Sequence, residues 1–210
     1  MKDSLDRYVA LGDSFTAGSA CEPGEAWPDL LAEMMRPSHP GIELWNLASH
    51  GATSAEVADQ LPDALALEPD LVTVVFGAND VLKTTRPDPR AYAERLILIV
   101  SELFDANPRT RIVTATSPES WEFLGLGPRT DARVRRGIAA LNAVTRAVAS
   151  AHGVACLEVV GHPGLSDPEN FSEDGLHPSP LGHRHAARAF AVEIETSFGI
   201  DIDAKRRTYA

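Results

Sequence analysis

Short apolar runs rich in β-branched residues alternate with longer segments of helical periodicity, and this alternation constrains the fold more than any other feature. The clearest run, residues 71–76 (LVTVVF), is almost continuously apolar, which is typical of a parallel strand covered on both faces. Strands separated by helices need crossover connections, which place helices on both sides of a parallel sheet. The sequence therefore predicts an α/β fold, a three-layer α/β/α sandwich around a parallel five-stranded sheet, with strands at residues 7–11, 42–46, 71–76, 111–115 and 154–159.

Helices are predicted between these strands wherever apolar residues recur three and four positions apart. The last helix is expected to start with Ser179 as its N-cap and Pro180 in its first turn. Its apolar stripe consists of Ala186, Phe190, Ile194 and Phe198. Two longer segments carry the expected buried positions Tyr92, Leu96, Ile99, Val100 and Leu103, and then Val134, Ile138, Leu141 and Val148.

Length and composition narrow the class of protein. A chain of 210 residues is expected to form a single domain over residues 1–210, with a core at about residues 6–199 and a C-terminal tail at 200–210. Its 19 Lys and Arg against 30 Asp and Glu give a net charge of −11, which argues against a nucleic-acid partner. No apolar run suits a membrane span or a signal peptide, so a cytoplasmic protein is expected. The two cysteines, Cys21 and Cys156, show no metal-ligand spacing.

Polar residues and glycines that could take part in catalysis follow four of the predicted strands. Residues 12–18 (GDSFTAG) follow the first, Gly51 follows the second, residues 77–80 (GAND) follow the third, and residues 174–178 (DGLHP) end a long loop after the fifth. Ligands of open α/β sheets bind outside the carboxyl ends of the strands. We therefore expect these four segments to meet at one edge of the sheet.

The residue types in these segments complement one another. A serine hydroxyl such as Ser14 becomes nucleophilic when a histidine takes its proton, and a carboxylate must hold that histidine in the correct tautomer. His177 and Asp174, three positions apart, suit these roles. The oxyanion of an acyl-transfer intermediate needs positioned donors, for which the N–H groups of Ser14 and Gly51 and the side chain of Asn79 are candidates.

The four segments, in this order, resemble the sequence blocks of the SGNH branch of the GDSL hydrolases. The resemblance spans residues 12–178; the second block is the least literal, and Gly51 is assigned to it by its place after a strand. It implies a flavodoxin-like sheet, a triad of Ser14, His177 and Asp174, an oxyanion hole of Ser14, Gly51 and Asn79, and ester hydrolysis with no cofactor and no metal. Asp13 and Asp80 are expected to brace their loops by hydrogen bonds.

The expected substrate is a small-molecule carboxylic ester. The chain has no room for a lid domain, so we expect a shallow cleft and short acyl groups, and the negative net charge favours neutral esters. A thioesterase, a lysophospholipase, an acyltransferase and a catalytically silent binding module remain alternatives. Residues 116–130 either pack their own aromatic side chains or face the substrate, in which case Trp121 and Phe123 contact it.

Overall fold

The computed structural model describes residues 5–119 and 122–202, and within them five strands form one parallel sheet. The strand order is β2-β1-β3-β4-β5, so β3 is the middle strand, and Ala10 of β1 pairs with Asn46 on one side and Thr73 on the other. This is the flavodoxin-like order, which confirms the predicted α/β fold. The strands are β1 (Arg7–Gly12), β2 (Glu43–Asn46), β3 (Leu71–Val75), β4 (Arg111–Ala115) and β5 (Ala155–Leu157).

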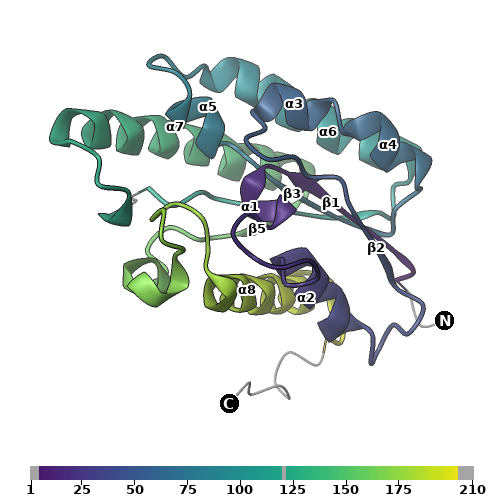
Figure 1. Ribbon diagram of the computed structural model, residues 1–210. Coiled ribbons are helices and arrows are strands. Elements are labelled where there is room, and N and C mark those ends of the chain that lie inside the picture. Colours follow the sequence, from purple (N-terminus) through teal and green to yellow (C-terminus); the bar gives the residue numbers. More distant parts are fainter. Residues whose placement is uncertain (1–4, 120–121, 203–210) are drawn as a thin grey trace.

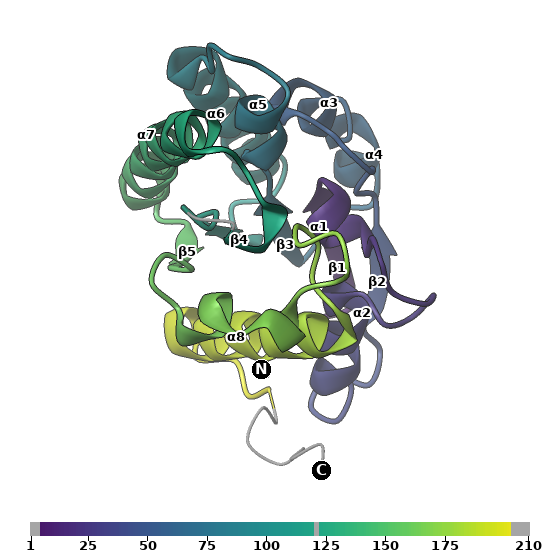
Figure 2. The same ribbon diagram turned by 60° about the vertical axis from the view of Figure 1, so that its left-hand side comes forward.

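Helices cover both faces of the sheet (Figures 1 and 2). One face carries α2 (Trp27–Met35) and α8 (Pro180–Phe198), and the other carries α3 (Ser54–Ala58), α4 (Leu61–Ala66), α6 (Pro89–Ala106) and α7 (Pro128–His152). The short helices α1 (Ser14–Ala17) and α5 (Ala78–Leu82) follow β1 and β3, and the 3₁₀ turns are η1 (Glu122–Leu124), η2 (Pro163–Ser166) and η3 (Pro168–Asn170). Across the described residues, none of these helices has the length and apolar character needed to cross a membrane.

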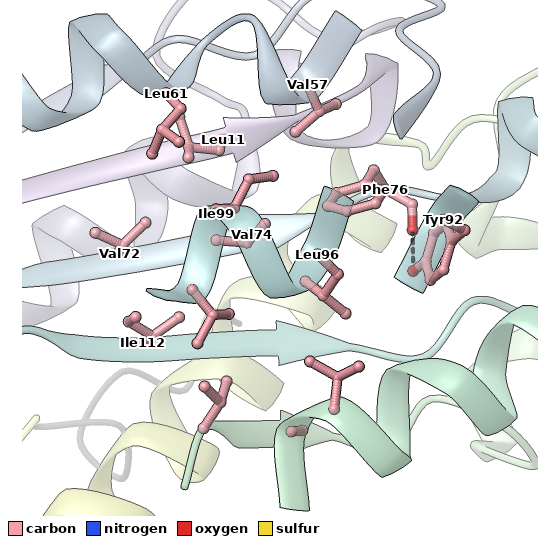
Figure 3. Packing of buried hydrophobic residues seen from close by; sticks show 14 of the residues in the cluster. Leu11, Val57, Leu61, Val72, Val74, Phe76, Tyr92, Leu96, Ile99 and Ile112 are labelled. Atoms are coloured by element: carbon pink, nitrogen blue, oxygen red, sulfur yellow. Dashed lines mark hydrogen bonds between the residues drawn. The ribbon is translucent and has the colours of Figure 1, made fainter. Parts of the chain in front are cut away.

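The core between the sheet and α6 shows why the predicted apolar residues are where they are (Figure 3). Side chains alternate along a strand, so Val72 and Val74 of β3 point to this face, where Leu96 and Ile99 of α6 pack over them. The hydroxyl of Tyr92 donates a hydrogen bond to the carbonyl oxygen of Phe76 at 3.3 Å, which satisfies it inside the core. The apolar stripes expected in α6 and α7 are buried, as predicted: Tyr92, Leu96, Ile99, Val100, Leu103, Val134, Ile138, Leu141 and Val148. In the stripe expected for the last helix, Phe190 and Ile194 are buried, whereas Ala186 and Phe198 are only partly buried.

The core on the opposite face joins α2 to α8. Phe190 of α8 stacks on Trp27 of α2 with ring centroids 4.1 Å apart. Ser179 caps α8 by accepting a hydrogen bond from the Gly182 N–H, as predicted. Ile200 and Ile202 are buried in the same cluster, so the expected start of the tail at residue 200 is wrong. The chain turns back at Gly199, and two isoleucines of the segment that follows pack into this core.

Candidate active site

Ser14 is held at the carboxyl edge of the sheet by a tightly fixed backbone. It is the first residue of α1, and the side chain of Asp13 caps that helix by accepting a hydrogen bond from the Phe15 N–H at 3.1 Å. The buried Gln60 bonds both the N–H and the C=O of Gly12, at 3.0 and 2.9 Å. Gly12 must be glycine, because a Cβ there would lie 2.5 Å from the carbonyl oxygen of Val75. This packing sets the direction in which the chain enters α1.

His177 links Ser14 to Asp174 in a continuous line of hydrogen bonds. Its Nε2 lies 2.9 Å from the Ser14 Oγ, although the two residues are 163 positions apart, and its Nδ1 lies 2.6 Å from the Asp174 Oδ2. The other carboxylate oxygen of Asp174 accepts hydrogen bonds from the backbone N–H groups of Leu176 and His177. The structure thus brings together the three residues that the sequence analysis selected for a triad.

The surroundings of Asp174 keep its carboxyl group ionised. Partial desolvation raises the pKa of Asp174, but hydrogen bonds from the His177 side chain and from backbone N–H groups outweigh it and hold that pKa well below its ordinary range. Its side chain is 49% exposed and that of His177 is 21% exposed. A carboxylate facing Nδ1 favours the tautomer with the proton on Nδ1, which leaves Nε2 free to accept the serine proton.

Three hydrogen-bond donors lie in segments that converge near Ser14. The Asn79 Nδ2 bonds the carbonyl oxygen of Ala52 at 3.1 Å and approaches the Asp13 Oδ2 at 3.4 Å, so the amide has a fixed orientation. Within residues 5–119 and 122–202, the backbone N–H groups of Ser14 and Gly51 have no acceptor. Gly51 has a φ of 75°, in the left-handed region that favours glycine. These donors are the three that the sequence analysis selected for an oxyanion hole.

Two contacts around these donors were not predicted from the sequence. Lys83, at the end of α5, donates a hydrogen bond to the carbonyl oxygen of Gly51. Asp80 accepts hydrogen bonds from the N–H and hydroxyl of Ser54, and the Arg95 guanidinium lies 4.0 Å from that carboxylate. The bracing role expected for Asp80 is therefore confirmed. Neither Lys83 nor Arg95 has a sequence signal, because each meets its partner only through the folding of α5 and α6 against the loop after β2.

Asp13 is a buried carboxyl group between Ser14 and Asn79. Burial raises the pKa of Asp13 to about 6, against the lowering effects of the hydrogen bond from Phe15 and of the nearby His177. Its hydrogen bond to the Phe15 N–H confirms that it braces the loop after β1.

A cavity of about 180 Å³ opens beside Ser14 and His177. It reaches Ala115 and Phe190, which are almost fully buried, so the site is deeper than the shallow cleft expected from chain length. The depth arises where small residues of α8 face the carboxyl ends of the strands. Most of the lining is apolar: Phe15, Val75, Phe76, Leu82, Ala115, Leu157, Val159, Leu165, Phe171, Leu176, Ala186, Ala189 and Phe190.

The irregular segment at residues 116–130 divides into parts with different surroundings. Thr116, Ser117 and Pro118 line the cavity, and the segment ends early because α7 begins at Pro128. Phe123 is not among the residues that line the cavity; its ring packs on Phe171, with centroids 5.1 Å apart. Trp121 lies outside the described residues.

The described part of the chain contains no cluster of three or more His, Cys, Asp or Glu side chains placed to hold a metal ion. Cys21 and Cys156 are both free thiols.

The fold and this site define a hydrolase of the flavodoxin-like α/β class, and comparison with known proteins gives its family. Residues 10–185 match the GDSL-like Lipase/Acylhydrolase family, which is more than half of the chain. The chain therefore belongs to this family and is a carboxylic ester hydrolase.

Individual relatives are distant but cover most of the chain. An arylesterase of Vibrio mimicus is 23% identical over 90% of this chain and 88% of its own length. The thioesterase 1/protease 1/lysophospholipase L1 of Escherichia coli K12 is 26% identical over 84% of this chain and 77% of its own. Among solved structures, the acetylxylan esterase Axe2 of Geobacillus stearothermophilus has a TM-score of 0.73 at 23% identity, over 92% of this chain and 96% of that one. That structural likeness establishes the fold.

Proposed function

We propose that this protein hydrolyses small-molecule esters with short acyl groups through an acyl-enzyme intermediate on Ser14. The observation that carries this proposal is the line of hydrogen bonds from Ser14 through His177 to Asp174, at 2.9 and 2.6 Å. Separations of this size are within direct proton-transfer reach.

The first half-reaction forms the acyl-enzyme. The Nε2 of His177 takes the hydroxyl proton of Ser14 while the serine oxygen bonds to the acyl carbon of the ester. The carbonyl becomes a tetrahedral oxyanion, and the carboxylate of Asp174 stabilises the imidazolium that has formed. His177 then gives its proton to the leaving alcohol as the ester C–O bond breaks, so the acyl group stays on Ser14.

The oxyanion is assigned to the N–H groups of Ser14 and Gly51 and to the amide of Asn79. The Ser14 N–H and the Gly51 N–H are free to donate within the described residues, and Asn79 is oriented by its bond to Ala52. Donors fixed before the reaction stabilise the developing charge without reorganising.

The second half-reaction returns the enzyme to its starting state. His177 takes a proton from water, the hydroxide bonds to the acyl carbon, and the proton passes to the Ser14 oxygen as the acid leaves. The same groups would serve a thioester substrate, or an alcohol that replaces water as the acceptor. Parallel reactions with different leaving groups and acceptors distinguish these activities.

The test compares two serines whose hydroxyl groups each contact a histidine ring. Besides Ser14, Ser19 bonds the Nδ1 of His50, so Ser19→Ala is a matched control. We expect a fluorophosphonate probe to label the native protein and Ser19→Ala but not Ser14→Ala, with hydrolysis of p-nitrophenyl butyrate following the same pattern. A thioester and an added alcohol acceptor in parallel reactions give the leaving group and the transfer activity. Equal labelling of Ser14→Ala and the native protein would overturn the proposal.

A further inference from the structure

The cavity beside Ser14 has a mostly apolar lining, which the bond-breaking chemistry at Ser14 does not itself require. Figure 2 shows α8 below the sheet, where it packs against β5. The cavity lies where α8 faces the carboxyl ends of β4 and β5, and Ala186 and Ala189 line it from the helix side. It is continuous with the site, because Ser14 and His177 line the same space.

Several polar side chains that line this cavity already have hydrogen-bond partners within the protein. The Thr116 hydroxyl donates to Glu158 at 2.7 Å, and Glu158 also accepts hydrogen bonds from Arg146. The Oδ1 of Asn170 lies 2.8 Å from the Nδ1 of His185, and the Nδ2 of Asn170 bonds the Gly164 carbonyl at 2.9 Å. A ligand in this space therefore gains from apolar contact rather than from new hydrogen bonds.

We infer that this cavity binds the acyl chain of the ester and sets the longest chain that the enzyme accepts. The inference rests on the proposed acyl-enzyme at Ser14, from which a chain enters the adjoining apolar space. A dry cavity of about 150 Å³ in another protein accommodates a six-carbon ring. A space of about 180 Å³ therefore suits acyl chains of roughly four to eight carbons.

Chain length should then affect rate in a defined way. Burial of each further methylene group contributes about a fourfold gain in kcat/KM. The gain should continue until the cavity is filled and then stop. An acetyl group is too short to fill the cavity, so acetyl esters should gain least from it.

The first experiment narrows the cavity and measures kcat/KM for p-nitrophenyl esters from acetyl to dodecanoyl. Ala186→Leu and Ala189→Leu add bulk to the lining, whereas Val192→Leu, at a position 54% exposed on the same helix, is the matched control. We expect each alanine variant to lose at least tenfold in kcat/KM on octanoyl ester relative to acetyl ester, and to shift its optimum by two or more carbons. The control should keep the native profile.

A second measurement is independent of catalysis. Octanoate should raise the Tm of Ser14→Ala protein, and the rise should be lost when Ala189→Leu is added to that variant. A native chain-length profile in both folded alanine variants, together with an unaltered octanoate effect, would overturn the acyl-site assignment. Equal fluorophosphonate labelling of Ser14→Ala and the native protein would instead overturn the proposed function, so the two failures can be told apart.

Discussion

The ammonium group of Lys83 donates a hydrogen bond to the carbonyl oxygen of Gly51, the residue whose N–H we assign to the oxyanion hole. Gly51 has few steric limits on its backbone, and its φ of 75° lies in the left-handed region. A bond to its carbonyl restricts the rotation that would swing the loop after β2 away from Ser14. We therefore expect Lys83 to act as a positioning residue for the Gly51 N–H, a donor that it does not itself supply.

Replacing Lys83 by Met should therefore lower kcat by roughly threefold to tenfold, well short of the 10²–10³ that follows loss of an oxyanion donor. The free energy of unfolding should change by less than about 1 kcal/mol, because the pair is exposed. Steady-state kinetics and thermal unfolding measure the two quantities. Lys83→Arg should restore part of kcat with KM unchanged, and Arg90→Met, which breaks an exposed pair with Glu94 on α6, is the control. A Lys83→Met enzyme with native kcat would show that the contact has no positioning role.

Asn79→Ala should lower kcat by about 10² to 10³ with a smaller change in KM, because the amide would act mainly on the oxyanion. Its bond to the Ala52 carbonyl fixes the amide in the native protein. Asn107→Ala, which removes an asparagine that bonds the Arg109 N–H beyond α6, controls for loss of an amide elsewhere. An unaltered kcat in Asn79→Ala would remove this residue from the oxyanion hole.

The parts of this structure that could be predicted are those that local pattern specifies. The run at residues 71–76 had to be a central strand, because only burial on both faces suits so many apolar side chains. Ser14, Asn79 and His177 were recognisable because each follows a segment whose end falls at the same sheet edge.

The parts that could not be predicted depend on contacts between distant segments. Gln60 clamps Gly12 across 48 positions, and nothing near either residue indicates the partner. The cavity is equally hidden, since Ala186 and Ala189 look like ordinary helix-forming residues until α8 is placed opposite β5. Small side chains reveal a cavity only when the positions of the residues packed around them are known.

Asp174→Asn should lower kcat by roughly 10³ to 10⁴, because an amide cannot stabilise the imidazolium and can impose the wrong tautomer on His177. Glu173→Gln, the adjacent exposed position, should leave kcat near the native value.

The stability of the protein should also depend on the charge of Asp174. The pKa of Asp174 is lowered in the folded protein, so its charge contributes stability above the ordinary carboxyl range, and that contribution is lost as the pH falls through and below this range. Denaturant unfolding of Asp174→Asn and the native protein at several pH values should show that the difference between their free energies of unfolding shrinks in acid. A difference that stays constant with pH would contradict this prediction.

Asp13→Asn should change the pH dependence of the free energy of unfolding in the sense opposite to that of Asp174→Asn. Burial raises the pKa of Asp13 to about 6, so the folded protein holds this proton more tightly than the unfolded chain does. The resulting stabilisation is fully present below about pH 4 and is lost as the pH rises through about 6, a change of at most about 3 kcal/mol.

Asparagine keeps an oxygen that can accept the Phe15 N–H while removing the titration. The free energy of unfolding of Asp13→Asn should therefore fall less than that of the native protein between pH 4 and pH 7, as measured by denaturant unfolding. Asp88→Asn, which alters the exposed carboxylate that caps α6, controls for substitution of a capping residue. Parallel pH curves for Asp13→Asn and the native protein would show that the buried carboxyl group does not take up a proton in this range. The assignment of Asp13 as a bracing residue would stand, since its hydrogen bond to Phe15 does not depend on that proton.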